Sequence, residues 1–269
     1  MRMQIVMPQL EVHRFSSPFE NTPHTHDDQY QITIPLQGTC HFTHEHKQLA
    51  LPPGEGIVLQ PSDRHSFYIG DGTGVVVIRI RPESLYPGDS SVYSEPRHRK
   101  QFDVGRVSRV FRQWTADMMA LDMADPLVEE ELEARMICDL RELVWEGTVP
   151  ASPKMAHAAA DRHLAQVLEY VHAHFTEQLS VSSLAAMAMQ SRYHFIRSFK
   201  SMTGVPPYQY VLQLRVREAM EQLKKSADTV TDISFNLGFS STSQFFRAFA
   251  KMTGMTPEQY RKSEGRRLI

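Results

Sequence analysis

The first part of the chain is patterned as short segments of alternating or β-branched residues. Turn-forming Gly, Pro, Ser and Asp residues separate these segments, as is typical of short strands joined by tight turns. The strands expected between residues 4 and 81 are 29–36, 40–43, 56–59, 66–69 and 75–81. Many short strands at this spacing predict an antiparallel sandwich or barrel over about residues 1–86.

The pattern then changes to a helical period, beyond a Pro-, Ser- and Gly-rich stretch at 82–96. Apolar side chains recur there at intervals of three and four residues, at Val107, Val110, Phe111, Trp114, Met118 and Leu121. A second helix is expected from the N-capping Asp125 to Gly147. We expect the two helices, 103–122 and 125–147, to form an antiparallel pair whose apolar stripes provide a homodimer interface.

Residues 148–160 contain two prolines and no regular apolar pattern, so we expect them to link two domains. The first domain is residues 1–147, with the helical pair at about 103–147. The second domain, 161–269, carries helical patterns throughout. The fold class expected is therefore α+β with two domains.

The second domain contains an internal repeat of about 50 residues. Nine residues of the first copy recur 50 positions later, namely Phe195, Arg197, Phe199, Met202, Thr203, Gly204, Pro207, Gln209 and Tyr210. Each copy predicts a helix, a turn and a helix: Ser180 and Ser191 are expected N-caps in the first copy, and Thr229 with Asp232 resembles a capping box in the second. A long helix from Pro207 to about Lys225 joins the copies.

The two domains differ in net charge. The chain carries 29 Lys and Arg against 31 Asp and Glu, a net charge of -2. Residues 161–269 hold 14 basic and 9 acidic residues, or +5, which leaves 15 against 22, or -7, for residues 1–160. A basic second domain favours a nucleic-acid partner.

The cysteines and the hydropathy pattern indicate the cellular compartment in which the protein is expected. Cys40 and Cys138 lie far apart with no C-x-x-C pair, which fits neither a disulfide framework nor a zinc finger. The first ten residues lack the apolar core of a signal peptide, and no window is apolar enough to span a bilayer. We expect a cytoplasmic protein that does not contact a membrane.

The outward faces of the second helix in each copy carry chemistry suited to DNA. At 100° per residue, the faces opposite the predicted core present Tyr193, Ile196, Arg197 and Lys200 in the first copy and Ser243, Phe246, Arg247 and Ala250 in the second. Arg can pair with guanine, and apolar groups can touch thymine methyls. The joining helix of roughly 18 residues spans about 27 Å, so two such helices could enter successive major grooves, which are about 34 Å apart. The alternative is a protein-interaction module made of two helical hairpins.

The second domain resembles the DNA-binding domain of the AraC/XylS family of bacterial transcription regulators. The residues that carry the resemblance are Asp232-Ile233, Leu237-Gly238-Phe239-Ser240, Ser243-Gln244-Phe245-Phe246-Arg247-Ala248-Phe249, Gly254, Pro257 and Tyr260-Arg261. The resemblance implies DNA contacts from Arg192, Tyr193, Ile196, Arg197, Thr242, Ser243, Phe246 and Arg247. Three positions depart from the family pattern: Ser234 and Phe246 stand where small residues are usual, and Ala250 stands where Lys is usual.

The first domain is similar to the cupin barrel in its histidine spacing. His24 and His26 are followed by Gln31 and Gly38, and His65 lies downstream. Two His at i and i+2 on a strand share a face, so with His65 they suit Zn, Ni, Mn or Fe. Gln31 stands where the metal-binding cupin has Glu, and related barrels bind organic effectors instead of a metal. We therefore expect these four residues to bind an effector, either a small molecule or a divalent transition metal.

Together these features predict a transcription regulator and not an enzyme. A cupin-like antiparallel barrel binds the effector, the helical pair forms a homodimer, and the two helix-turn-helix units bind promoter DNA. RNA polymerase is a further partner if the protein is an activator. The alternative is a cupin metalloenzyme, an isomerase or dioxygenase, that uses His24, His26 and His65 and has the second domain as a tether.

Overall fold

The computed structural model describes residues 2–85, 98–121, 123, 125–145 and 157–265. The chain divides into two compact units: residues 1–117 with 135–150 form the first, and residues 118–134 with 151–269 form the second. Residues 148–156 of the expected linker, and the expected helix end at Gly147, lie outside the described residues. The following helix, α4, begins at His157.

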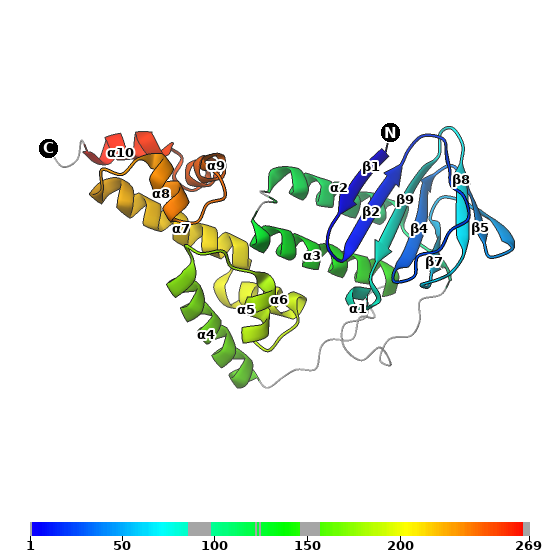
Figure 1. The fold of residues 1–269 in the computed structure, drawn as a ribbon, viewed down its shortest axis with the longest axis horizontal. Helices are drawn as coiled ribbons and strands as arrows, with labels where there is room; N and C mark the ends of the chain where they lie inside the picture. Colours follow the sequence, from blue (N-terminus) through cyan, green and yellow to red (C-terminus); the bar gives the residue numbers. More distant parts are fainter. Residues whose placement is uncertain (1, 86–97, 122, 124, 146–156, 266–269) are drawn as a thin grey trace. The chain divides into compact units, whose positions relative to one another are not determined.

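The first unit is built from two antiparallel sheets (Figure 1). The larger has the strand order β1-β2-β9-β4-β7-β10, and the smaller has the order β3-β8-β5-β6. Their bounds are β1 Arg2–Val6, β2 Leu10–Phe15, β3 Phe19–Glu20, β4 Tyr30–Gln37, β5 Cys40–His44, β6 Lys47–Leu51, β7 Glu55–Leu59, β8 His65–Ile69, β9 Gly74–Ile80 and β10 Arg99–Gln101. The five strands expected from the sequence are present.

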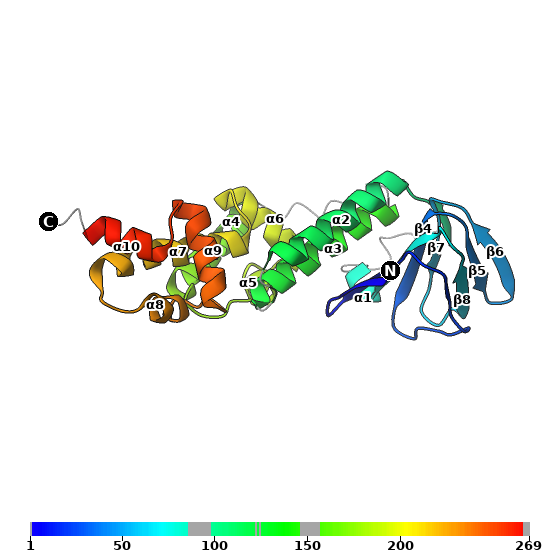
Figure 2. The ribbon, with the colours of Figure 1, turned by 90° about the horizontal axis from the view of Figure 1, so that it is seen from above.

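The two sheets face each other, as Figure 2 shows with β4 and β7 on one side and β5, β6 and β8 on the other. The apolar core between them includes three buried aromatic residues, Phe15 from the larger sheet and Phe42 and Phe67 from the smaller sheet, together with aliphatic side chains of both sheets. The unit has the expected cupin-like antiparallel architecture, but among the described strands no ladder joins the two sheets into a ring, so the barrel is open. The short edge strand β3 explains part of this, because two residues support little pairing.

The helical pair lies on the face of the larger sheet that is turned away from the smaller sheet. The helices are α2 (Val104–Ala120) and α3 (Pro126–Trp145), preceded by the short α1 (Pro82–Leu85). Arg14 of β2 lies over the ring of Phe111, and Arg141 donates to the carbonyl oxygen of Ser84. The pair is also joined by the Trp114 indole N–H, which donates to Asp139 at 2.8 Å.

Four large side chains of the apolar stripes of this pair are buried within a single chain. Phe111, Trp114, Leu132 and Leu140 are each at most 3% exposed. The stripes were expected to form a homodimer interface, but a second copy of the chain is not needed to cover these four side chains. Burial of this kind already accounts for the apolar period in the sequence.

The second unit contains the repeated helices. They are α4 (His157–His174), α5 (Val181–Met187), α6 (Arg192–Thr203), α7 (Pro207–Lys225), α8 (Val230–Asn236), α9 (Thr242–Thr253) and α10 (Pro257–Gly265). Ser180, Ser191 and Thr229 accept hydrogen bonds as N-caps, as expected, and Ser241 caps α9. Figure 1 shows α5 and α6 toward one end of α7, and α8 and α9 toward the other.

Both copies of the repeat have the same internal packing. Phe195 and Phe199 pack 5.5 Å apart in α6, and Phe245 and Phe249 pack 5.5 Å apart in α9, all four fully buried. Each copy therefore has its own small apolar core, built on two phenylalanines four residues apart. No helix among the residues described here combines the length and apolar character needed to cross a membrane.

The turn inside each copy requires a left-handed backbone. The position is Met189 in the first copy, with φ 53°, and Gly238 in the second, with φ 79°. A Cβ at Gly238 would lie 2.2 Å from the carbonyl oxygen of Thr176, so only glycine fits there. The glycine is explained by this close approach as well as by the turn.

Candidate functional site

The candidate DNA-facing surface of the first copy lies on α6. Arg197 and Lys200 are exposed, and Tyr193 and Ile196 are half-buried. The guanidinium of Arg197 lies 5.5 Å from the centre of the Tyr193 ring, and its Nη1 donates to the Tyr193 hydroxyl at 3.3 Å. This contact restricts the rotamers of an otherwise free side chain, which lowers the entropy cost of binding a ligand with it.

The equivalent surface of the second copy lies on α9. Ser243 and Arg247 are exposed, and Thr242 and Phe246 are half-buried. Phe246 packs against the core of its copy, with its ring 6.1 Å from that of Phe245. Ala250 is exposed, so this surface lacks the positive charge that Lys200 supplies on α6.

Arg192, the first residue of α6, is already paired with a carboxylate. Its Nη1 donates to Oε2 of Glu133 on α3 at 3.1 Å, and the Glu133 side chain is only 1% exposed. Both residues belong to the second unit. Among the expected DNA-contacting residues, Arg192 thus has its charge neutralised by a carboxylate in the part of the chain that the structure describes.

Other acidic residues at the start of α3 bind the ends of the repeated helices. Glu130 accepts hydrogen bonds from the backbone N–H and hydroxyl of Ser182 at the start of α5. Glu131 accepts from the backbone N–H of Tyr208 at the start of α7, at 3.0 Å. Free N–H groups and the helix dipole make these positions favourable for a carboxylate. The beginning of α3 thus docks onto the first copy of the repeat.

Arg215 is a structural residue that the sequence did not reveal. It is 3% exposed in the middle of α7. Its Nε donates to the carbonyl oxygen of Phe175 at 2.7 Å, its Nη2 donates to that of Glu177 at 2.9 Å, and its Nη1 lies 3.5 Å from Asp125. No local pattern distinguishes it from the exposed Arg217 two residues later.

The three histidines of the first unit come together. The ring centres of His24, His26 and His65 are 4.5 to 5.3 Å apart, and one nitrogen from each lies within 4.8 Å of the others. The backbones of His24 and His65 form an isolated antiparallel bridge, with both hydrogen bonds at 2.9 Å. The fourth expected residue, Gln31, is buried and accepts a hydrogen bond from His26 Nε2 at 3.2 Å.

Backbone carbonyl groups select the tautomer of two of these rings. His24 Nδ1 donates to the carbonyl oxygen of Thr22 at 2.9 Å, and His65 Nδ1 donates to that of Asp63 at 2.9 Å. A carbonyl oxygen only accepts, so Nδ1 carries the hydrogen and Nε2 keeps its lone pair in each ring. The Nε2 of His65, a residue 2% exposed, has no hydrogen-bond partner among the described residues.

Burial favours the neutral form of two of the imidazoles, those of His26 and His65. It lowers the pKa of His65 to about 4 and also lowers the pKa of His26, with the positive charge of Arg79 as a further cause for His26. Neutral imidazoles can bind a metal ion or accept a hydrogen bond from an organic ligand. The group therefore has the chemistry of a ligand site at neutral pH.

A second polar group, which the sequence reasoning missed, lies on the same face as Gln31. Arg79 of β9 is the cross-strand partner of both Gln31 and Glu11. Its Nη2 is ion-paired with Glu11 and donates to His13 Nε2 at 2.8 Å. The polar alternation of Glu11 and His13 within the apolar strand β2 was the available signal.

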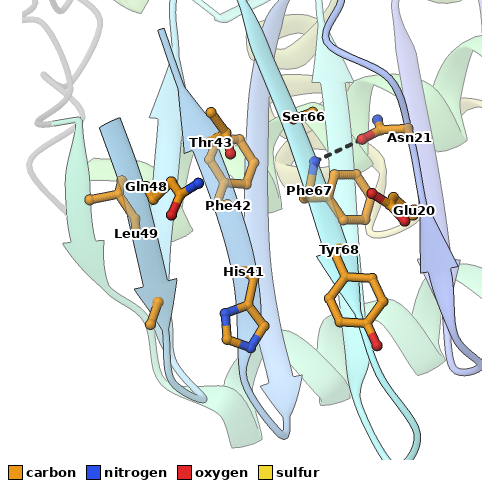
Figure 3. A pocket seen from close by; sticks show the side chains of 11 residues that line it. Glu20, Asn21, His41, Phe42, Thr43, Gln48, Leu49, Ser66, Phe67 and Tyr68 are labelled. Carbon is orange, nitrogen blue, oxygen red and sulfur yellow. Dashed lines mark hydrogen bonds between the residues drawn. The ribbon is translucent and has the colours of Figure 1, made fainter. Parts of the chain in front are cut away.

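A hollow of about 430 Å³ lies on the outer face of the smaller sheet (Figure 3). His41 and Tyr68, from β5 and β8, and Glu20 and Asn21, from β3 and the residue after it, contribute to its lining. The Asn21 side chain accepts from the backbone N–H of Phe67 at 2.7 Å. The hollow is separate from the histidine group, because His41 and Tyr68 alternate with buried residues that face the other sheet.

Two family models match the chain. The model of an AraC-like ligand-binding domain matches residues 8–137, and that of a helix-turn-helix domain matches residues 184–263. The two matched regions cover most of the described strands and the repeated helices. The order of the two domains also agrees with the order of the structural elements.

Curated bacterial proteins are similar to the chain over most of its length. The uncharacterized HTH-type transcriptional regulators YdeC and YobQ of Bacillus subtilis are 22% and 27% identical, each over 82% of this chain and over 79% and 81% of their own lengths. The HTH-type transcriptional activator RhaS of Klebsiella pneumoniae is 23% identical over 82% of this chain and 81% of its own. The similarity thus includes both domains.

Proposed function

Because the chain belongs to the AraC family of DNA-binding transcription regulators and has an N-terminal ligand-binding domain, we propose that a ligand bound by His24, His26, Gln31 and His65 controls its binding to promoter DNA. The α6 and α9 surfaces make the DNA contacts in this proposal. Arg197 and Arg247 occupy equivalent positions in the two copies and are both exposed, so they are the side chains proposed to read bases.

The observation that supports a ligand at the histidine group is the buried Nε2 of His65. A buried polar atom without a partner costs free energy, of the order of 1 to 3 kcal/mol. The His65 ring centre lies 4.5 Å from that of His24 and 5.3 Å from that of His26, so a ligand held by those two histidines would lie next to the His65 ring. A ligand that binds the lone pair of His65 Nε2 recovers the lost interaction.

A divalent transition metal fits the residues present. Two of the three imidazoles have their Nδ1 hydrogens held by carbonyl groups, which is the outer support that metal-binding histidines usually have. Zn, Ni, Mn and Fe accept imidazole nitrogen ligands, and Gln31 would add a neutral oxygen. A bound metal would supply positive charge and coordination positions for an organic ligand.

Two further partners belong to this proposal. A homodimer would place two copies of the DNA-binding unit on one promoter. Its interface would use side chains other than the four buried stripe residues of α2 and α3. RNA polymerase would be contacted if the protein is a transcriptional activator, which is what its relative RhaS is called.

We propose that the chain is not an enzyme, since its relatives over both domains are regulators. The alternative is the cupin metalloenzyme, which would need an open metal site. An isomerase or dioxygenase activity that requires Fe or Mn and disappears in His65→Ala would contradict the proposal. Gln31 in place of a carboxylate weakens that alternative, because an amide is a poorer ligand for a hard cation.

The test of the proposal uses full-length protein and a duplex selected from a random library by the protein itself. Affinity is measured by fluorescence anisotropy after chelator treatment and after addition of Zn, Ni, Mn or Fe. We expect one of these metals, or a small molecule added with it, to change the affinity severalfold. The change should be lost in His26→Ala and His65→Ala and retained in His46→Ala, which removes an exposed histidine from the β5–β6 turn. Selection that yields no binding duplex would contradict the proposal.

A further inference from the structure

The inner face of the larger sheet has a polar end beside the histidine group. Cross-strand partners point to the same face, so Glu11, Arg79 and Gln31 lie in one row across β2, β9 and β4. The next row, from His13 through Val77 to Thr33, is also partly polar, whereas Phe15 and Val75 beyond it belong to the apolar core between the sheets. The three strands run side by side in Figure 1.

Arg79 is held in place but keeps unused donors. The two hydrogens of its Nη2 are directed to Glu11 and His13, and the latter accepts at 2.8 Å. Its Nε and Nη1 donate to no protein atom in the described part of the chain, although the side chain is only 23% exposed. A guanidinium withdrawn from water needs acceptors for its hydrogens, so these three N–H groups favour an acceptor ligand.

The unused donors face the same region as the imidazoles. Arg79 is directly opposite Gln31, and Gln31 is hydrogen-bonded to His26. Charge also connects the two groups, because the pKa of His26 is lowered in part by Arg79. A small ligand that contacts Arg79 therefore lies next to the three-histidine group.

We propose that the effector of this regulator is a small organic acid whose carboxylate is bound by Arg79, with a further hydroxyl or keto oxygen of the same molecule at His24, His26 and His65. This inference rests on the proposed function, because it names the ligand class of the same site. The planar fork of arginine matches a carboxylate in a bidentate geometry. Neutral imidazoles, or a metal that they hold, suit the uncharged oxygen.

Glu11 sets the selectivity in this arrangement. Its ion pair holds the guanidinium in place, and its negative charge repels a second carboxylate. An acid that binds Arg79 must therefore gain enough from the donors that Glu11 does not use to offset this repulsion. Removing that charge while keeping the shape, as in Glu11→Gln, should strengthen carboxylate binding. A purely structural ion pair would give the opposite result, because loss of Glu11 would only loosen Arg79.

The experiment measures binding to full-length protein by titration calorimetry, with and without the metal that the protein retains. The probes are two pairs that differ in one carboxylate, glucuronate against glucose and lactate against 1,2-propanediol, with inorganic phosphate as a separate anion. We expect at least one acid to bind at least tenfold more tightly than its neutral partner and than phosphate. Arg79→Gln should weaken that binding at least tenfold, Arg79→Lys should restore little of it, and Glu11→Gln should tighten it severalfold.

The control variant is Arg14→Gln, which removes the same charge from the opposite face of β2, where Arg14 lies over Phe111. It should bind the acid as the unaltered protein does. Circular dichroism separates loss of fold from loss of binding, and the gain in Glu11→Gln does not depend on the fold of Arg79→Gln. Equal binding of acid and neutral partner, preference for phosphate, or no acid binding would overturn the inference.

DNA binding measured in the same samples distinguishes this inference from the proposed function. If an acid binds through Arg79 but leaves the affinity for the selected duplex unchanged, the ligand class stands and the proposed control of DNA binding fails. If the metal alone or a neutral molecule changes the DNA affinity and the acids do not, the proposed function stands and the organic acid is excluded.

Discussion

The carbonyl oxygen of Asp63 accepts the Nδ1 hydrogen of His65 at 2.9 Å, and this one contact determines which nitrogen of the buried ring has a lone pair. The buried ring lies 4.5 Å from that of His24 and 5.3 Å from that of His26, measured between ring centres. A backbone acceptor cannot change its role with pH or rotate away as a side chain can. In the proposed ligand site, the tautomer of His65 is therefore set before any ligand binds.

The first prediction is a loss of stability in mild acid. Burial lowers the pKa of His65 to about 4, below the ordinary value of 6.5 that applies in the unfolded chain. Between these values the unfolded state binds a proton that the folded state does not, so the free energy of unfolding falls as pH decreases from about 6.5 to about 4. The slope from this group is at most about 1.4 kcal/mol per pH unit.

Chemical denaturation in chelator at several pH values measures this effect. His65→Phe should flatten the pH dependence in that range, and the exposed-histidine control His46→Ala should not. A slope that is the same in His65→Phe and in the unaltered protein would contradict the assignment to His65.

The second prediction concerns Arg192 and Glu133. Glu133→Gln keeps the size and an acceptor oxygen but removes the charge, so Arg192 becomes more available to DNA phosphates. We expect the affinity for the selected duplex to rise roughly two- to fivefold, because a partly exposed ion pair contributes a free energy of about that size. The matched control is Glu129→Gln, which removes one charge from the same turn of α3. Equal affinities of the two variants would show that the pair does not compete with DNA.

The third prediction concerns the buried Arg215. Arg215→Met would leave two carbonyl groups and Asp125 without this donor, which should lower the free energy of unfolding by about 3 to 5 kcal/mol. Arg215→Lys should recover little, since an ammonium group cannot reach three acceptors in the same geometry. The helical signal in urea unfolding measures the effect. Arg217→Met, at an exposed position on the same helix, should change the stability by less than about 0.5 kcal/mol.

The fourth prediction concerns the two exposed arginines of the repeat. Arg197→Ala and Arg247→Ala should each weaken binding to the selected duplex by about 1 to 3 kcal/mol and relax the base preference at one position. Lys225→Ala removes the same charge from the end of α7 and should leave the base preference unchanged. Fluorescence anisotropy at several salt concentrations measures the three affinities. An equal loss of affinity in all three variants would mean that the arginines contribute only their charge and do not read bases.

Local signals allowed much of the second unit to be predicted from the sequence. The N-caps Ser180, Ser191 and Thr229 and the long α7 follow from residues a few positions apart, because capping and helical periodicity act within one or two turns. The repeat itself predicts two equivalent cores. The left-handed turn at Gly238 is also local, although the close approach of Thr176 that makes glycine necessary is not.

The candidate ligand site was only partly predictable. The motif containing His24, His26, Gln31 and His65 identified four of its residues by resemblance, and the structure brings those four together. Arg79 and Glu11 were missed because their place depends on the register of β9 against both β2 and β4. A shift of one residue in that register would turn Arg79 to the other face of the sheet.

By itself the sequence determined the family, the order of strands and helices, the repeated DNA-binding fold and which residues are apolar enough to be buried. Only the tertiary structure decided what those residues pack against. Phe111 and Trp114 were expected at a dimer interface and are buried within the chain. The acidic start of α3 supplies Glu130 to the start of α5 and Glu131 to the start of α7, which nothing local in the sequence indicates. A periodic pattern specifies that a face is covered or charged, but the partner of that face is selected by the packing of residues distant in the chain.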